Sequence, residues 1–210
     1  TTELNGFIKI KDFFDSFKIS ETYDSDRKSF DINGIIDLTN SKIRVPRLNY
    51  NKENGKKSEL NFDVSFIFGK YYSIKKLIFT ADKNRINLSN VKLNNNLEVD
   101  DFKKLEVVTF ENKIKNNDFI IKKLKDITII GEIFDAQPML KSLYKTSDRD
   151  TFSKKFSSKI RINLNKALTG TNDDISNFSM IASINKGSYD KLSLKGNFSE
   201  DEIVEMSIYQ

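Results

Sequence analysis

A serine three residues before a lysine is the spacing in this chain that comes nearest to a catalytic arrangement. In some serine enzymes a lysine at this distance activates the serine hydroxyl as a nucleophile. The chain of 210 residues contains the spacing at Ser25 and Lys28, Ser73 and Lys76, Ser142 and Lys145, Ser183 and Lys186, and Ser188 and Lys191. Such repetition in a chain rich in serine and lysine indicates chance, so no catalytic residue is predicted from it.

The residue types that the chain lacks exclude more chemistry. There is no cysteine and no histidine, which rules out thiol catalysis, imidazole general-base catalysis, disulfides and the common zinc sites. The adjacent acids Asp173 and Asp174 are typical of solvated turns. We therefore expect a non-catalytic protein with no metal and no cofactor.

The charge pattern gives no sign of a nucleic-acid partner. The net charge of +5 comes from 35 basic and 30 acidic residues, and the two signs alternate along the chain. The basic residues Lys122, Lys123 and Lys125 stand beside apolar ones. Nucleic-acid-binding domains instead gather Arg and Lys on one face and add exposed aromatics.

Apolar side chains at every second position predict that β-strands build the chain. The clearest strand covers residues 60–68. Its period of two recurs at Ile86 and Leu88, at Ile127 and Ile129, at Ile160, Ile162 and Leu164, at Met180, Ala182 and Ile184, at Leu192 and Leu194, and at Val204, Met206 and Ile208. Strands with one apolar and one polar face are typical of an antiparallel sheet that is solvated on one side.

The connections between these strands are expected to lack the usual turn residues. Two prolines and eight glycines are few for a β-rich chain of this length. Turns should therefore depend on Asn, Asp, Ser and Lys. The segments 92–101 (KLNNNLEVDD) and 112–118 (NKIKNND) are interpreted as connections of this kind.

One short helix near residues 135–145 interrupts the strands. Met139, Leu140 and Leu143 have helical spacing, Asp135 is suited to the N-terminal cap, and Pro138 is suited to the first turn. The sequence thus predicts a first run of strands over 1–134, a helix over 135–146 and a second run over 147–210. No stretch has the roughly 20 apolar residues that span a bilayer, and the first residue is not Met, so we expect one segment of a longer protein.

Three pieces of the chain resemble, in their order and spacing, the pattern of a known protein family. They are residues 30–57, 89–108 and 127–143. The first contains G-x-x-D-L-T from Gly34 to Thr39, followed by Lys52 and Gly55. The last contains G-x-x-x-D-A-x-P-x-L from Gly131 to Leu140. This pattern resembles the AsmA-like envelope proteins, most closely the C-terminal AsmA-like region of the YhdP type. The chain departs from it at Tyr50, where the family pattern has Trp.

The resemblance implies a long, twisted antiparallel sheet that curls into an open apolar groove. It also implies a periplasmic bridge, held in the inner membrane by an anchor outside this segment, that carries phospholipid acyl chains to the outer membrane beside other envelope proteins. The groove would be lined by Leu60, Phe62, Val64, Phe66, Phe68, Ile86, Leu88, Ile127, Ile129, Ile160, Ile162, Leu164, Leu192 and Leu194.

One-faced strands alone leave two alternatives open. A closed β-sandwich that binds carbohydrate or protein would pair its apolar faces and leave no continuous groove. A scaffold for outer-membrane assembly would use the same strands without binding lipid.

Overall fold

The computed structural model describes residues 1–67, 71–94, 96, 99–143, 157–170, 174–199 and 202–209. The chain is mainly β and divides into two compact units. Unit 1 comprises Thr1–Arg44 and Asn51–Val107, and unit 2 comprises Val45–Tyr50 and Val108–Gln210.

Unit 1 is a run of antiparallel strands in which side chains alternate between two faces. Its strands are β1 (Thr2–Ile10), β2 (Phe13–Asp24), β3 (Ser29–Asp37), β6 (Glu59–Ile67), β7 (Tyr71–Ala81), β8 (Asn84–Leu93) and β9 (Val99–Asp101), and each pairs antiparallel with the next. The connection from β3 to β6 carries β4 (Ile43–Val45), the 3-10 helix η1 (Pro46–Leu48) and β5 (Tyr50–Lys52). The strands β4 and β5 pair with each other.

Unit 2 contains the short helix and the strands on either side of it. Its strands are β11 (Ile114–Lys123), β12 (Ile127–Asp135), β13 (Ser158–Leu168), β14 (Ile175–Asn185), β15 (Ser188–Asn197) and β16 (Ile203–Tyr209), with helix α1 (Gln137–Leu143) after β12. Strand β10 (Lys104–Glu111) contains the division between the units.

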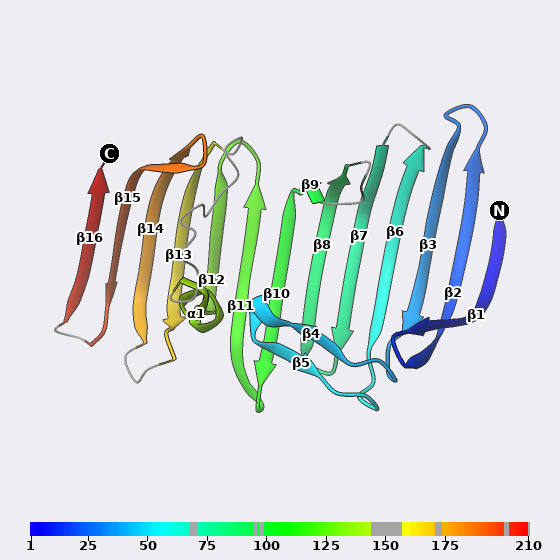
Figure 1. The fold of residues 1–210 in the computed structure, drawn as a ribbon, viewed down its shortest axis with the longest axis horizontal. Helices are drawn as coiled ribbons and strands as arrows, with labels where there is room; N and C mark the ends of the chain where they lie inside the picture. Colours follow the sequence, from blue (N-terminus) through cyan, green and yellow to red (C-terminus); the bar gives the residue numbers. More distant parts are fainter. Residues whose placement is uncertain are drawn as a thin grey trace. The chain divides into compact units, whose positions relative to one another are not determined.

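Hydrogen-bonded neighbours follow the order β1-β2-β3-β6-β7-β8-β10-β11-β12-β13-β14-β15-β16, with β9 beside β8, in an open, mostly antiparallel sheet of 14 strands (Figure 1). The expectation of a purely antiparallel sheet is wrong at one ladder, because β12 and β13 run parallel. Parallel neighbours need a crossover, since the chain must return before it can enter the next strand in the same direction. Helix α1 belongs to that crossover.

The turns use the residues that the composition predicts. Asn112 and Lys113, with φ of 49° and 68°, link β10 to β11, and Lys186 and Gly187, with φ of 49° and 82°, link β14 to β15. Two successive positive φ values match the twist of the flanking strands. The predicted connection 112–118 is therefore a turn only at its start, and the rest belongs to β11.

Close backbone approach explains one glycine of unit 2. A Cβ atom built on Gly131 would lie 2.3 Å from the carbonyl oxygen of Asp118 and 2.6 Å from Cα of Phe119. The register between β11 and β12 shifts at this point, between Asp118 and Phe119. Only glycine leaves room for the neighbouring strand at such a bulge.

Candidate functional site

The predicted lining residues of unit 1 lie on one face of their strands. Leu60, Phe62 and Val64 of β6 stand opposite Phe79, Leu77 and Ile74 of β7. On the other side of β6, Leu60 and Val64 face Ile36 and Ile32 of β3. The pairs Phe79–Ile86 and Leu77–Leu88 extend the set to β8. We call this set, with Phe66, the apolar face of unit 1; Phe68 lies outside the described residues.

Side chains on the apolar face of unit 1 are mostly half-buried. The six predicted and described members, Leu60, Phe62, Val64, Phe66, Ile86 and Leu88, all have this intermediate exposure. Cross-strand neighbours lie beside each of these side chains. The face therefore offers non-directional apolar contact and no converging polar groups.

A row of four aromatic rings crosses the apolar face of unit 1. Ring centroids are 4.8 Å apart between Tyr23 and Phe30, 5.3 Å between Phe30 and Phe66, and 6.1 Å between Phe66 and Tyr72. The rings come from β2, β3, β6 and β7, so the row runs across the strands. Sequence reasoning identified only Phe66, because the register that aligns the other three rings cannot be read from alternation within one strand.

Unit 2 has an apolar face built in the same way. Ile127 and Ile129 of β12 stand beside Ile160 and Ile162 of β13, and these stand opposite Ala182 and Met180 of β14. The set continues through Leu192 and Leu194 of β15 to Ile208 and Met206 of β16. Leu164 and Ala182 are buried, Met206 and Ile208 are exposed, and the other predicted lining residues are half-buried.

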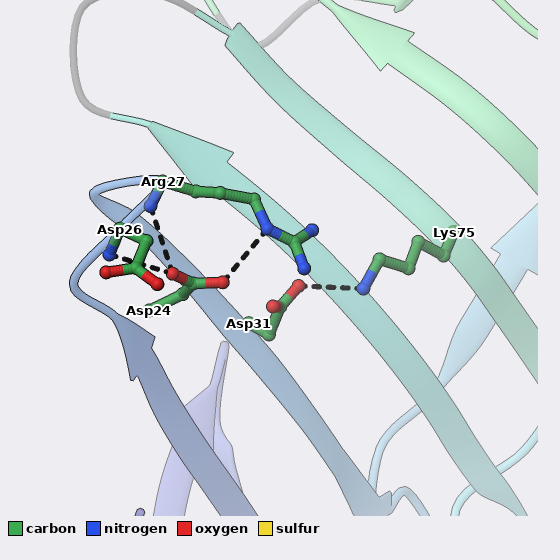
Figure 2. A network of polar contacts seen from close by, with 5 residues as sticks. All are labelled: Asp24, Asp26, Arg27, Asp31 and Lys75. Carbon is green, nitrogen blue, oxygen red and sulfur yellow. Dashed lines mark hydrogen bonds and ion pairs between the residues drawn. The ribbon is translucent and has the colours of Figure 1, made fainter.

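The opposite face of unit 1 carries ion pairs. The ammonium nitrogen of Lys75 lies 2.7 Å from Asp31 (Figure 2). It also lies 3.7 Å from Asp63. The hydrogen bond from Lys75 is the main cause that lowers the pKa of Asp31, and a hydrogen bond from Ser65 lowers it further. In the β2–β3 turn, Asp24 accepts the backbone N–H groups of Asp26 and Arg27.

A buried lysine fastens the connection that leaves β3. Lys52 is 2% exposed, and its ammonium donates to the carbonyl oxygens of Leu38 at 2.7 Å, Thr39 at 3.1 Å and Ser41 at 2.6 Å. Burial lowers the pKa of Lys52, and the nearby carboxylates of Asp15 and Asp37 oppose that shift. These residues form the Lys52 cluster. Its geometry holds a loop, because backbone carbonyls take all three described bonds of the amine.

Asp15 anchors the same loop from β2. Its side chain is buried and accepts the Ser41 hydroxyl and, at 3.0 Å, the backbone N–H of Asn40. The Asn40 amide donates to the carbonyl oxygen of Phe14 at 2.9 Å. Sequence reasoning missed Asp15, and no pattern around it marks a buried acid.

A second buried polar cluster lies in unit 2 around Asp135. One carboxylate oxygen of Asp135 accepts the backbone N–H of Gln137 at 3.1 Å, and the other accepts the side-chain amide of Asn49 at 3.0 Å. The Asp135 backbone N–H donates to Asn117 at 3.0 Å, and Asn117 in turn donates to the carbonyl oxygen of Leu48 at 2.8 Å. We call this set, with Thr109 and Asn116, the Asp135 cluster.

Asp135 therefore has a wider role than the predicted helix cap. The carbonyl oxygen of Ala136 accepts the first bond of the helix, from Leu140, so Ala136 occupies the cap position and Asp135 precedes it. The Asp135 side chain still satisfies the N–H of the first helical residue, and Pro138 is the second residue of α1, in its first turn. By also binding Asn49, the carboxylate fastens the segment after η1 to the start of the helix.

Several of the residues that carry the sequence resemblance lie at these two clusters. Leu38, Thr39 and Lys52 belong to the first, and Gly55 donates its N–H to the carbonyl oxygen of Thr39 at 2.8 Å. Asp135 and its neighbour Ala136 belong to the second. Their positions support roles in holding connections.

Among the described residues, no group of three or more acidic side chains could hold a metal ion. No described helix is long and apolar enough to cross a membrane. Comparisons with family models, curated proteins and solved structures give no match. The two apolar faces are the candidate binding surfaces, because the register gathers apolar side chains of successive strands on them.

Proposed function

We propose that the chain is a non-catalytic, lipid-binding segment of a bacterial envelope bridge protein. In this proposal phospholipid acyl chains lie along the apolar faces and pass between the inner and outer membranes. The observation that carries it is the register, which gathers the apolar side chains of successive strands onto one face of each unit. The sequence resemblance to AsmA-like proteins of the YhdP type adds the periplasm and a membrane anchor outside this segment.

A large accessible surface supports this proposal. The accessible surface is 14556 Å², whereas a compact monomer of this mass exposes about 10,000 Å². Acyl chains gain about 0.8 kcal/mol for each CH₂ that leaves water. A face with half-buried Phe, Ile, Leu and Val can supply that gain at many points, which suits a ligand that must move.

Two features favour lipid over the closed-sandwich alternative. The described strands of the main sheet follow one open order instead of two facing sheets that would cover each other. The apolar faces also lack the polar groups with which a carbohydrate site fixes hydroxyls. The second candidate is an assembly scaffold that binds protein on the same faces. Photocrosslinking distinguishes it from a lipid-binding segment.

Photocrosslinking from the apolar face tests the proposal. A benzophenone analogue of phenylalanine replaces Phe62, and the matched control places it at Asn33, an exposed residue of β3 on the opposite face. We expect phospholipid adducts from position 62 and none from position 33, measured by mass spectrometry after irradiation in bacterial cells. Protein adducts without lipid at position 62 would support the scaffold, and equal lipid labelling at both positions would contradict a specific face.

A further inference from the structure

An exposed isoleucine lies on the face of unit 2 that is opposite its apolar face. Ile181 of β14 is 61% exposed, and it pairs with Arg161 of β13 on one side and with Ser193 of β15 on the other. Residues two positions apart in a strand share a face. The register of these three neighbouring strands therefore gives Ile181 eight neighbours on this face.

Positive charge surrounds Ile181. Four of its eight neighbours are the exposed basic residues Lys159, Arg161, Lys191 and Lys195, and the other four are three serines and an asparagine. Direct and diagonal neighbours across an antiparallel ladder lie roughly 4.5–8 Å apart, so the long basic side chains can reach around the isoleucine. We call Ile181 and these four basic residues the basic patch.

Three described acids lie at the margin of the basic patch. Asp126 approaches Arg161 at 3.8 Å. Glu205 of β16 stands opposite Lys195, and Asp190 is the extra residue at the register shift in β15. None of the three lysines of the patch forms an ion pair with a described residue. Their ammonium groups can therefore take an anionic partner.

The corresponding feature of unit 1 has the opposite charge. Ile35 of β3 is 41% exposed on the face opposite the apolar one, where it pairs with Lys18 of β2. Three acids surround it, namely Asp37 of its own strand and Glu59 and Asp63 of β6. A single exposed isoleucine is ordinary on a protein surface. The sign of the surrounding charge distinguishes the two sites, and Ile35 is the matched comparison for the basic patch.

We propose that the basic patch docks unit 2 on a bilayer that contains anionic phospholipids. Lysine and arginine bind the phosphate groups, and the isoleucine enters the boundary between head groups and acyl chains. Each basic residue near an anionic surface strengthens binding roughly fivefold. An acidic protein segment would need only the cations, so the apolar side chain at the centre favours the bilayer. This docking uses the face opposite the proposed acyl-chain surface and does not depend on the proposed function.

A single introduced tryptophan tests whether position 181 enters the bilayer. The chain has no tryptophan, so Ile181→Trp places one fluorophore in the basic patch. We expect its emission to shift to shorter wavelength on vesicles of phosphatidylglycerol and phosphatidylcholine, and to be quenched when their acyl chains are brominated. Vesicles of phosphatidylcholine alone should cause no shift. Ile35→Trp is the matched control and should respond to neither kind of vesicle.

Charge neutralisation tests the patch without a change at its centre. In co-sedimentation with the anionic vesicles, Lys159→Gln combined with Lys191→Gln should lower the partition coefficient roughly 25-fold. The control combines Lys83→Gln with Lys92→Gln, which removes the same charge from exposed residues of unit 1. It should lower the partition coefficient less than about threefold, because salt screens charges that lie away from the membrane contact.

Several outcomes would overturn the proposal. Absence of binding to the anionic vesicles would do so directly. An equal response of Ile35→Trp, or an equal loss for the control pair of lysines, would assign binding to net charge alone. The same emission shift of Ile181→Trp with soluble polyglutamate would assign the patch to an acidic protein.

A variant of the apolar face separates docking from lipid transport. Phe66→Asp changes the apolar face of unit 1 and leaves the basic patch intact, so vesicle binding should persist. Persistence would support docking even if the purified chain carried no lipid. Loss of vesicle binding in Phe66→Asp would overturn docking, because lipid held on the apolar face would then explain the association.

Discussion

Lys52 shows how a single buried polar residue can stabilise this chain when all its hydrogen-bonding groups have partners. The ammonium is held by three backbone carbonyls, and a buried charge is tolerated only when such partners are present. Asp135 follows the same rule with amide donors from Asn49, Asn116 and Gln137. Both residues lie where a long connection meets a strand. Replacing either one should therefore lower the free energy of unfolding.

Lys52→Met should lower the free energy of unfolding by about 3 kcal/mol or more. The methionine retains the length of the side chain but leaves the carbonyl oxygens of Leu38, Thr39 and Ser41 without their donor, each at about 1–3 kcal/mol. Urea unfolding followed by circular dichroism measures the change. Lys42→Met, at an exposed residue of the same connection, is the control and should change stability by less than about 1 kcal/mol.

Asp135→Ala should cost more than the roughly 1 kcal/mol of a lost helix cap. The truncation leaves the amide groups of Asn49 and Asn116 and the N–H of Gln137 unsatisfied in a buried place, so we expect about 3 kcal/mol. Asp135→Asn preserves the shape and one acceptor oxygen and should be milder. A loss near 1 kcal/mol for Asp135→Ala would show that the Asn49 and Asn116 contacts contribute little.

Tyr50 should make stability depend on alkaline pH. Burial raises its pKa from 10.0 to about 12, so the folded state holds the phenolic proton more tightly than the unfolded state. This contribution is complete below pH 10.0 and is lost as the pH rises to about 12. Two units correspond to roughly 3 kcal/mol. Tyr50→Phe should flatten the decline measured by urea unfolding, and equal slopes for both proteins would contradict the burial effect.

At the scale of elements, apolar residues at every second position predict the strands in which this alternation is regular. β6, β13 and β15 were visible because their apolar residues occupy every second position. β7 was hidden because its register shifts: Asp63 pairs with Lys76 and Val64 with Ile74, which leaves an extra residue in β7. Asn116 and Asn117 were mistaken for a turn because buried asparagines and turn asparagines look alike until their partners are known.

Phe66→Asp should abolish binding at the apolar face of unit 1 while the sheet remains folded. Phe66 is half-buried and stacks between Phe30 and Tyr72, so a charge there would have to meet acyl chains or water. Phe66→Leu keeps the surface apolar and is the control. Binding of a fluorescent fatty acid and far-ultraviolet circular dichroism measure the two effects. Unfolding by Phe66→Asp, with Phe66→Leu intact, would assign Phe66 to a closed core.

At the scale of the whole molecule, the two units share one design despite their different connections. Each has an apolar face along successive strands, and each has a long connection fastened by a buried polar cluster. In the proposed function, a ligand would contact such a face along its surface instead of being enclosed in a pocket.

The purified chain should carry phospholipids with mixed head groups. The apolar faces present no converging polar residues that would select one head group, and exposed patches beyond a few hundred Å² bind lipid, detergent or another copy. Native mass spectrometry before and after delipidation measures the bound species. A lipid-free protein that also fails to bind a fluorescent fatty acid would contradict the lipid proposal.

The parallel ladder between β12 and β13 has a consequence for how unit 2 folds. In a hairpin such as β14–β15, pairing can begin at Asn185 and Ser188 beside the turn and continue residue by residue, because these first partners are close in sequence. In the parallel ladder every pair, such as Ile127 and Ile160, is 33 positions apart, so no local contact starts it. Closing such a loop costs chain entropy before any contact forms, and non-local pairing slows folding. The folding rate of unit 2 should therefore be set by the pairing of two preformed antiparallel segments, β11–β12 and β13–β14. Asp135 belongs to the parallel ladder that joins them.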